Sequence, residues 1–284
     1  MSKVRRPVVA GYFYPSRRSE LIEMIEWSFK HSIGPGMLPQ LSTERRKGII
    51  GYIVPHAGYM YSGPIAAHAY YDMAQYGVLD TIIVLGTNHT GLGKPISVYP
   101  EGAWETPLGV LHVDGELGKK VVEYSELGDF DVYAHLEEHS IEVQLPFIQY
   151  IYRYNTKILP IVIGIHTPEA ASDLANAIYN AARDLNRDII VLASSDFNHY
   201  EPHNITVEKD NLAISKIIEL NTGEFYRVLI HEDISICGPG GIMTLIELTK
   251  KINGKARLLK HATSGDISGD KRAVVGYASI KFQM

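Results

Sequence analysis

Residues Thr81–Gly86 read TIIVLG, and this apolar run leads directly into the polar sequence Thr87-Asn88-His89. A run that is apolar at nearly every position is typical of a parallel strand covered on both faces. Five more runs of this kind can be read along the chain: Gly48–Pro55, Lys157–Gly164, Asp188–Ala193, Arg257–Lys260 and Ala273–Phe282. We expect all six to be strands.

Segments with a helical pattern separate these runs. They are Arg18–His31, Gly63–Tyr76, Gly115–Ser125, Glu138–Tyr154, Pro168–Leu185, Val207–Leu220, Gly223–Ile230 and Gly240–Ile252. Strands that alternate with helices indicate an α/β fold, so we predict a mostly parallel central sheet with helices on both faces. Pro95–Tyr99 and Val110–Val113 are shorter and suggest a small β excursion. Nothing marks a second core, so we expect residues 1–284 to form a single domain.

The composition excludes several classes of protein. The 284 residues include 27 basic and 32 acidic side chains, which gives a formal net charge of −5 at pH 7. This negative charge argues against a protein that binds nucleic acids or anionic membranes. One cysteine allows no internal disulfide and no CxxC-type site. No apolar run is long enough to span a membrane, and the basic stretch Met1–Arg6 is not followed by the apolar segment of a signal peptide. We therefore expect a cytoplasmic protein.

Polar side chains follow several of the predicted strands at the point where each strand ends. His56 follows the run that ends at Val54, His89 follows Gly86, and Asp196 and His199 follow the run that ends at Ala193. Because the carboxyl ends of parallel strands meet at one edge of a sheet, these side chains should converge there. Several imidazoles beside a carboxylate are typical of a metal site with a general base beside it.

Cys237 allows two interpretations. It lies in Ile236-Cys237-Gly238-Pro239-Gly240, just before a predicted helix, where backbone N–H groups and the helix dipole would favour the thiolate form that binds metals. A lone cysteine is also commonly a small buried apolar residue, and the glycines would then mark only a tight turn.

The segment His135-Leu136-Glu137-Glu138-His139 matches the H-x-x-E-H pattern of some zinc proteases, although five-residue matches are weak. In the predicted helix the i, i+3 spacing puts His139 and Glu142 on one face. They could line a pocket or orient a ligand, or they could form an exposed polar face. Five other histidines are better explained as structural or surface residues: His68, His112, His166, His203 and His231.

Together, these motifs resemble the Memo family. The similar segments occur in the same order and span nearly the whole chain: Arg6–Pro15 (RPVVAGYFYP), Pro55–Tyr59 (PHAGY), Gly86–His89 (GTNH), Glu138–Glu142 (EHSIE), Ser194–Tyr200 (SSDFNHY) and Cys237–Pro239 (CGP). The resemblance implies a fold shared with class III extradiol dioxygenases, which are non-haem iron enzymes.

The resemblance also implies roles for individual residues. His56 and His89 match the two histidine ligands of the iron, and His199 resembles the acid/base histidine, with Asp196 beside it. Cys237 stands where those dioxygenases have a carboxylate ligand. A thiolate is softer and suits copper, zinc or iron–thiolate chemistry, so ring-cleaving activity does not carry over. We expect Fe(II) or copper, and we expect that the protein can be purified metal-free.

Two functions follow from this reading. The first is a metal-dependent oxidoreductase of unknown substrate, in which His56, His89 and Cys237 bind the metal and His139 and Glu142 line the pocket. The alternative is a non-enzymatic binding or adaptor protein that recognises a phosphorylated peptide or small anion in the same pocket, as the resemblance implies for some members. The sequence favours the first, because a Cys237 thiolate would repel an anion. The expected ligand is a small molecule or a peptide.

Overall fold

The computed structural model describes residues 4–284, so residues 1–3 of the basic N-terminal stretch lie outside the described part of the chain. A nine-stranded sheet forms its centre. Its strands are β2 (Ile49–Val54), β3 (Thr81–Thr87), β4 (Ile96–Val98), β7 (Gly128–Phe130), β8 (Lys157–Ile163), β9 (Ile189–Ser194), β10 (His199–Glu201), β11 (Lys255–Thr263) and β12 (Val274–Gln283). They are ordered β10-β12-β2-β9-β3-β8-β4-β7, and β11 pairs with β12.

The four central strands are parallel. β2 pairs with β9, β9 with β3, and β3 with β8 in parallel register. On the two sides of this centre, β12 and β4 run antiparallel to their inner neighbours. All residues of β2 and β3 are buried, as the uninterrupted apolar runs predicted. The centre is too crowded for side chains at some positions: a Cβ on Gly51 would lie 2.0 Å from the carbonyl oxygen of Val191.

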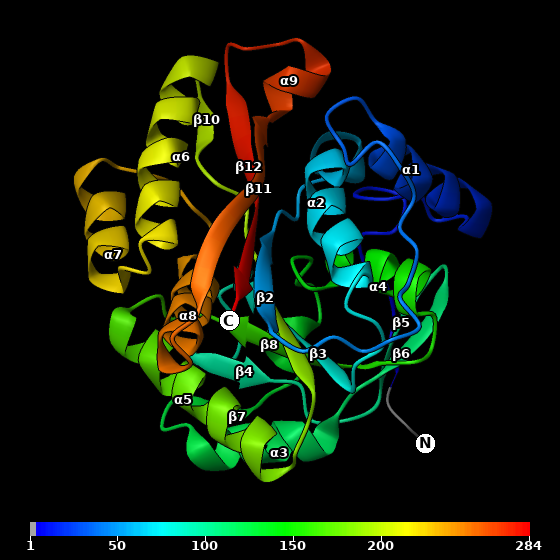
Figure 1. Ribbon diagram of the computed structural model, residues 1–284, viewed down its shortest axis with the longest axis vertical. Coiled ribbons are helices and arrows are strands. Elements are labelled where there is room, and N and C mark those ends of the chain that lie inside the picture. The colour runs from blue at the N-terminus through cyan, green and yellow to red at the C-terminus, as the bar shows by residue number, and fades with distance from the viewer. Residues whose placement is uncertain (1–3) are drawn as a thin grey trace.

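Helices cover both faces of the sheet. They are α1 (Arg18–Lys30), α2 (Tyr59–Ala74), α3 (Gly115–Tyr124), α4 (Leu145–Tyr152), α5 (Pro168–Asp184), α6 (His203–Ile218), α7 (Thr222–His231), α8 (Pro239–Lys251) and α9 (Ser264–Ser268). In Figure 1, α1, α2 and α4 lie together on one side, and α3, α5 and α8 lie on the other. The predicted α/β architecture is thus confirmed. None of the helices described within residues 4–284 is long and apolar enough to cross a membrane.

One predicted helix is wrong over its first half. The segment Glu138–Tyr154 is helical only in α4, which begins at Leu145 and has Pro146 in its first turn, where a missing N–H costs nothing. A 3₁₀ turn at Glu142–Gln144 precedes it, and His139 lies in irregular chain. His139 and Glu142 therefore do not share a helix face.

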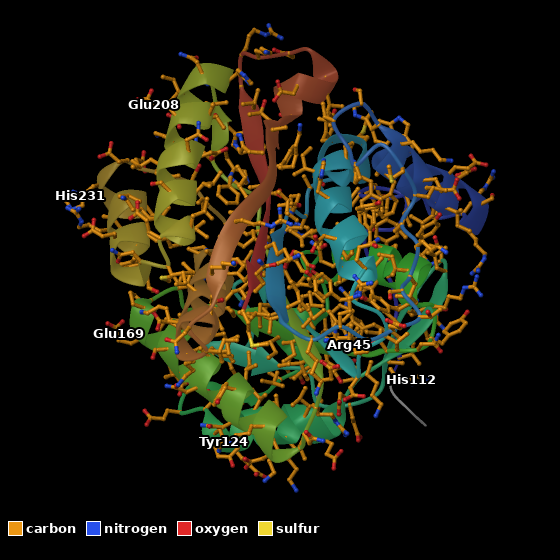
Figure 2. The ribbon with its side chains drawn as sticks, viewed as in Figure 1. Arg45, His112, Tyr124, Glu169, Glu208 and His231 are labelled. Atoms are coloured by element: carbon orange, nitrogen blue, oxygen red, sulfur yellow. The ribbon has the colours of Figure 1, made fainter. Side chains whose placement is uncertain are left out.

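A smaller three-stranded sheet ties down the N-terminal segment. It contains β1 (Val4–Arg5), β5 (Ala103–Thr106) and β6 (Gly109–His112) in the order β1-β5-β6. Figure 2 shows His112 of this sheet and His231 of α7 at the outside of the molecule, and both are exposed. These two histidines are surface residues, as expected from the sequence.

Glu142 is the anchor of the N-terminal segment and has no exposed surface. Its carboxylate lies 2.5 Å from the Arg5 guanidinium and accepts hydrogen bonds from the N–H groups of Val8 and Val9 and from the Tyr14 hydroxyl. The sequence analysis placed Glu142 in the pocket wall. In the structure both of its oxygens are used to hold residues 5–14 against the core.

We expect Glu142→Gln to lower the free energy of unfolding by about 3–5 kcal/mol, because it leaves the buried Arg5 charge without its partner. Urea denaturation followed by circular dichroism measures this change. Glu208→Gln, an exposed position on α6, is the matched control and should change stability by less than about 0.5 kcal/mol. Equal stability of the two variants would contradict the anchoring role.

Candidate metal centre

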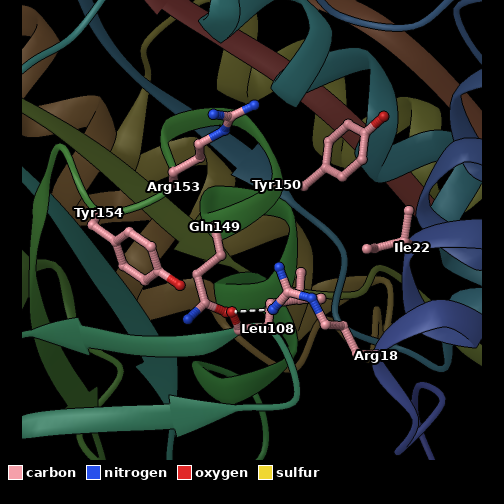
Figure 3. A pocket seen from close by; sticks show the side chains of 7 residues that line it. All are labelled: Arg18, Ile22, Leu108, Gln149, Tyr150, Arg153 and Tyr154. Carbon is pink, nitrogen blue, oxygen red and sulfur yellow. Dashed lines mark hydrogen bonds between the residues drawn. The ribbon is translucent and has the colours of Figure 1, made fainter.

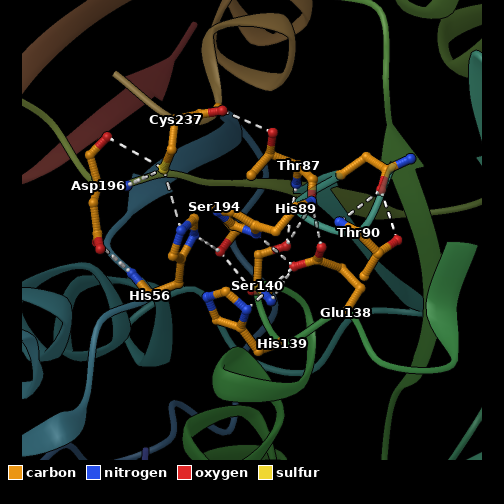
Figure 4. Close-up of polar contacts among 12 residues, drawn as sticks. His56, Thr87, His89, Thr90, Glu138, His139, Ser140, Ser194, Asp196 and Cys237 are labelled. Atoms are coloured by element: carbon orange, nitrogen blue, oxygen red, sulfur yellow. Dashed lines mark hydrogen bonds and ion pairs between the residues drawn. The ribbon is translucent and has the colours of Figure 1, made fainter. Parts of the chain in front are cut away.

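Three histidines meet at the carboxyl ends of the central strands. His56 follows β2, His89 follows β3, and His139 comes from the irregular chain before α4. Each offers a ring nitrogen, and these three nitrogens lie within 4.8 Å of one another (Figure 4). The His56 ring stands at 89° to the other two rings, whereas His89 and His139 stack with 4.4 Å between ring centroids. His56 is 2% exposed, and the side chains of His89 and His139 are 35% and 20% exposed.

The hydrogen bonds around Ser194 fix the tautomer of His56. The Ser194 hydroxyl donates to the carbonyl oxygen of Ser140 at 2.6 Å and accepts from the Gln144 amide at 2.8 Å. Its proton is therefore already used, so the Nδ1 of His56, 3.0 Å away, is the donor in that contact. The proton sits on Nδ1, and the Nε2 of His56 is left as an electron-pair donor.

Glu138 orients His89, and the sequence analysis did not include it among the site residues. One carboxylate oxygen lies 2.9 Å from the Nδ1 of His89, and the other accepts the backbone N–H of His89 at 2.7 Å. Burial alone would raise the pKa of Glu138, but its hydrogen bonds with His89 and the His89 charge lower it to about 2. A carboxylate behind a ligand histidine is the usual partner in metal sites. Its signals in the sequence were its place in the H-x-x-E-H match and in the family-like segment Glu138–Glu142.

Cys237 lies beside this cluster, immediately before α8. Its Sγ is 3.2 Å from the Nε2 of His56 and accepts the backbone N–H of Asp196, also at 3.2 Å. Burial, together with the nearby Asp196 charge, raises the pKa of the Cys237 thiol. The predicted thiolate is therefore not favoured by the protein alone, because burial and the Asp196 charge outweigh the hydrogen bonds to the sulfur. The contact with His56 nevertheless places the sulfur next to an unprotonated ring nitrogen, whose lone pair is free to bind a metal.

Asp196 and His199 both follow β9, but they have separate roles. The Asp196 carboxylate accepts the backbone N–H groups of His56 and Ala57 at 2.7 and 3.3 Å, so it fixes the chain that carries His56. His199 instead donates its Nδ1 proton to the carbonyl oxygen of Ser235 at 2.7 Å, which leaves its Nε2 free to accept a proton. Within residues 4–284, no hydrogen bond joins Asp196 to His199. Ser235, two residues before Cys237, is a positioning residue that the sequence analysis missed.

Burial favours the neutral imidazole in two of the three histidines, His56 and His139. Burial, reinforced by the neighbouring His139 and His89, holds the pKa of His56 well below its usual range. Burial also lowers the pKa of His139 to about 4, although the Glu138 charge opposes this shift. Burial raises the pKa of Asp196 to about 6 against the hydrogen bond from the N–H of His56. Neutral imidazoles with free nitrogens are the form that binds iron, copper, zinc or nickel, so these residues suit a transition metal.

The H-x-x-E-H match is not a metal site. His135 is fully buried, and its ring packs edge-on against Tyr99 and Trp104. Its Nε2 contacts the carbonyl oxygen of Ser97 at 3.1 Å. The histidine of this motif that joins the cluster is His139. Glu138 contacts the Nδ1 of His89, on the opposite side of the ring from the Nε2 that is free to bind a metal.

The chain is similar to known proteins in sequence and, separately, in fold. A family model described as Memo-like protein matches residues 5–281. The chain is 64% identical over 280 residues to a MEMO1 family protein of Desulfurococcus amylolyticus and 52% identical over 282 residues to one of Ignicoccus hospitalis, in each case over 99% of both chains. The crystal structure of an uncharacterized protein from Escherichia coli K12 has a similar fold, with a TM-score of 0.50, 11% identity, and coverage of 82% of this chain and 99% of that one.

We expect acidification to destabilise the protein through its buried histidines. In the unfolded chain His139 takes up a proton near pH 6.5, but in the folded chain it does so only near 4. The stability it contributes is therefore complete above pH 6.5 and is lost as the pH falls toward 4. Asp196, with its raised pKa, opposes part of this loss.

His139→Asn should accordingly flatten the slope of unfolding free energy against pH by up to about 1.4 kcal/mol per pH unit between these limits. Urea titrations at several pH values measure the slope. His231→Asn, which changes an exposed histidine, should keep the wild-type slope, and identical slopes in both variants would show that His139 is not held neutral.

Proposed function

The chain belongs to the family of Memo-like proteins, and from that premise we propose that it is a cytoplasmic metal-dependent oxidoreductase that acts on a small organic substrate with dioxygen. The observation that carries the proposal is the convergence of His56, His89 and His139, with the Cys237 thiol beside them, at the carboxyl edge of the sheet. Imidazole and thiolate together suit iron and copper, the two redox-active metals expected from the sequence.

We propose His56, His89 and Cys237 as the ligands, with His139 in the wall of the site. The lone pair of an imidazole lies in the ring plane, so two rings stacked face to face direct their lone pairs along separate planes and not at one nearby ion. His89 and His139 are inclined by only 27°, whereas His56 stands at 89° to His89. The perpendicular pair can converge on one ion, and the sulfur of Cys237 already contacts the free Nε2 of His56.

A bound iron or copper would supply electron transfer and an open position for oxygen. The protein's own residues would orient the ligands and move protons. Glu138 and Ser194 hold His89 and His56 with their Nε2 atoms free, and Ser235 leaves the Nε2 of His199 free to accept a substrate proton. Phe13 packs on the His139 ring, with 4.6 Å between centroids, and shields that side of the site from water.

The alternative, capture of a phosphorylated peptide or small anion, has less support from the charges at the site. The acidic side chains in direct contact with the cluster are Glu138, which bonds His89, and Asp196, which holds His56. Both carboxylates would repel a phosphate, and burial holds His56 and His139 neutral. A metal cation therefore fits these surroundings better than a phosphate does.

The metal content of the protein tests this function. The protein is expressed anaerobically, and its metals are measured by mass spectrometry before and after reconstitution with Fe(II) and Cu(I). We expect about one iron or copper per chain, lost in His89→Ala and Cys237→Ala but retained in His139→Ala and in the exposed control His231→Ala. Oxygen uptake with phenolic and thiol substrates should depend on the bound metal.

The reverse pattern, with metal lost in His139→Ala and kept in Cys237→Ala, would make the three histidines the ligands. Zinc as the only metal retained, without oxygen uptake, would refute the redox function. Phosphopeptide binding by a chain that takes up no metal would establish the alternative.

A second prediction concerns Glu138. Glu138→Gln keeps the side chain's shape but weakens the hydrogen bond that orients His89, so metal affinity should fall by about 10–100-fold. Competition with a chelator of known affinity measures this. Glu137→Gln changes the neighbouring exposed carboxylate and should leave the affinity unchanged.

A further inference from the structure

A pocket lies away from the histidines, where α4 leads into the amino end of β8. It has a volume of about 410 Å³ and is lined chiefly by Arg18, Leu108, Gln149, Tyr150, Arg153 and Tyr154 (Figure 3). α4 runs from beneath the histidine cluster, where Gln144 bonds Ser194, to this pocket at its C-terminal end. The chain then enters β8 at its amino end, whereas the histidines follow the carboxyl ends of β2 and β3. The length of the strands therefore separates the two sites.

The pocket is basic in a chain with a net charge of −5. Arg18 is held in place by a 2.7 Å hydrogen bond from its guanidinium to the carbonyl oxygen of Leu108. Among residues 4–284, neither Arg18 nor Arg153 forms an ion pair with a carboxylate. The carboxylate that reaches the rim is that of Glu26, which accepts from the Tyr150 hydroxyl and is itself paired with Lys30. Two guanidinium groups are therefore free to bind an anion.

Gln149 adds an unsatisfied donor. The residue is 5% exposed, and its side-chain oxygen accepts the hydroxyl proton of Thr106. Its amide nitrogen has no hydrogen-bond partner, and Figure 3 shows this nitrogen on the Tyr154 side of the pocket. A buried amide without a partner is costly. An acceptor oxygen of a ligand that displaces Tyr154, a residue that is 67% exposed, would satisfy it.

Arg153 also has an unusual backbone. Its φ is 56° and its ψ is −108°, a conformation that glycine adopts freely and other residues rarely do. Strained residues of this kind cluster at binding sites, where the side chain has to be presented in one direction. Here the strain places a guanidinium at the rim of a basic pocket.

We propose that this pocket binds a nucleoside monophosphate. Arg18 and Arg153 would hold the phosphate, because planar guanidinium groups match phosphate oxygens. The ring of Tyr150 offers a flat face on which a base can stack, and Gln149 would donate to a ligand oxygen. The volume lies within the range of about 300–1,000 Å³ that is usual for small-molecule sites. This site is independent of the proposed redox function.

Isothermal titration calorimetry at low salt tests the proposal, with adenosine monophosphate, inorganic phosphate and adenosine as the three probes. We expect adenosine monophosphate to bind one per chain, and each of the other two to bind at least ten-fold more weakly. Arg18→Gln and Arg153→Gly should each weaken binding of the monophosphate at least ten-fold. Arg153→Gly should also raise the melting temperature, because glycine relieves the strained backbone.

The control is Arg227→Gln, which removes an exposed arginine of α7 that is paired with Glu224 and should leave binding unchanged. Metal content should be the same in all these variants, which separates this test from that of the redox site. Absence of binding, or binding unaffected by both Arg18→Gln and Arg153→Gly, would overturn the proposal. Equal affinity for phosphate and the monophosphate would overturn the nucleoside part of it.

Discussion

The register between β2, β9 and β3 is the constraint on which the metal centre depends. Val54 pairs with Ser194, and Leu85 pairs with Ala193, so the ends of three strands lie level with one another. His56 stands two residues beyond one end, and Ser194 at the end of the next strand reaches it. Because side chains alternate between the faces of a strand, a slip of one residue would turn Ser194 away and leave His56 without its partner.

The parts of the fold that were predictable are those with a strong local pattern. All six apolar runs lie in strands, and the signal is strongest in the central strands, where residues buried on both faces leave an uninterrupted run. The segment from Glu138 to Gln144 was mistaken for helix because its apolar spacing continues into α4. Its conformation is set instead by side-chain hydrogen bonds: the Glu138 carboxylate accepts the backbone N–H of Ser140, two residues further on, and that of His89, 49 positions away. No periodicity in the sequence records such contacts.

The sequence predicted where the site lies and which side chains could bind a metal. It did not predict the hydrogen bonds that orient these side chains. Strand ends identified the positions of His56, His89, Asp196 and His199. The groups that orient them were not visible, since Glu138 reaches His89 across 49 positions and Ser235 reaches His199 across 36. The roles of the acidic residues were the hardest to predict. Glu138, Glu142 and Asp196 all sit beside histidines in the sequence motifs, yet each accepts backbone N–H groups in the fold.

Cys237 has a consequence for how the protein can be studied. It is the single cysteine of the chain, and its sulfur is packed between His56 and the backbone of Asp196. Any thiol reagent that modifies this protein must therefore enter that one location. The rate of alkylation therefore reports on the accessibility and reactivity of that site, with no background from other thiols, and a single spectroscopic label reports on that position alone.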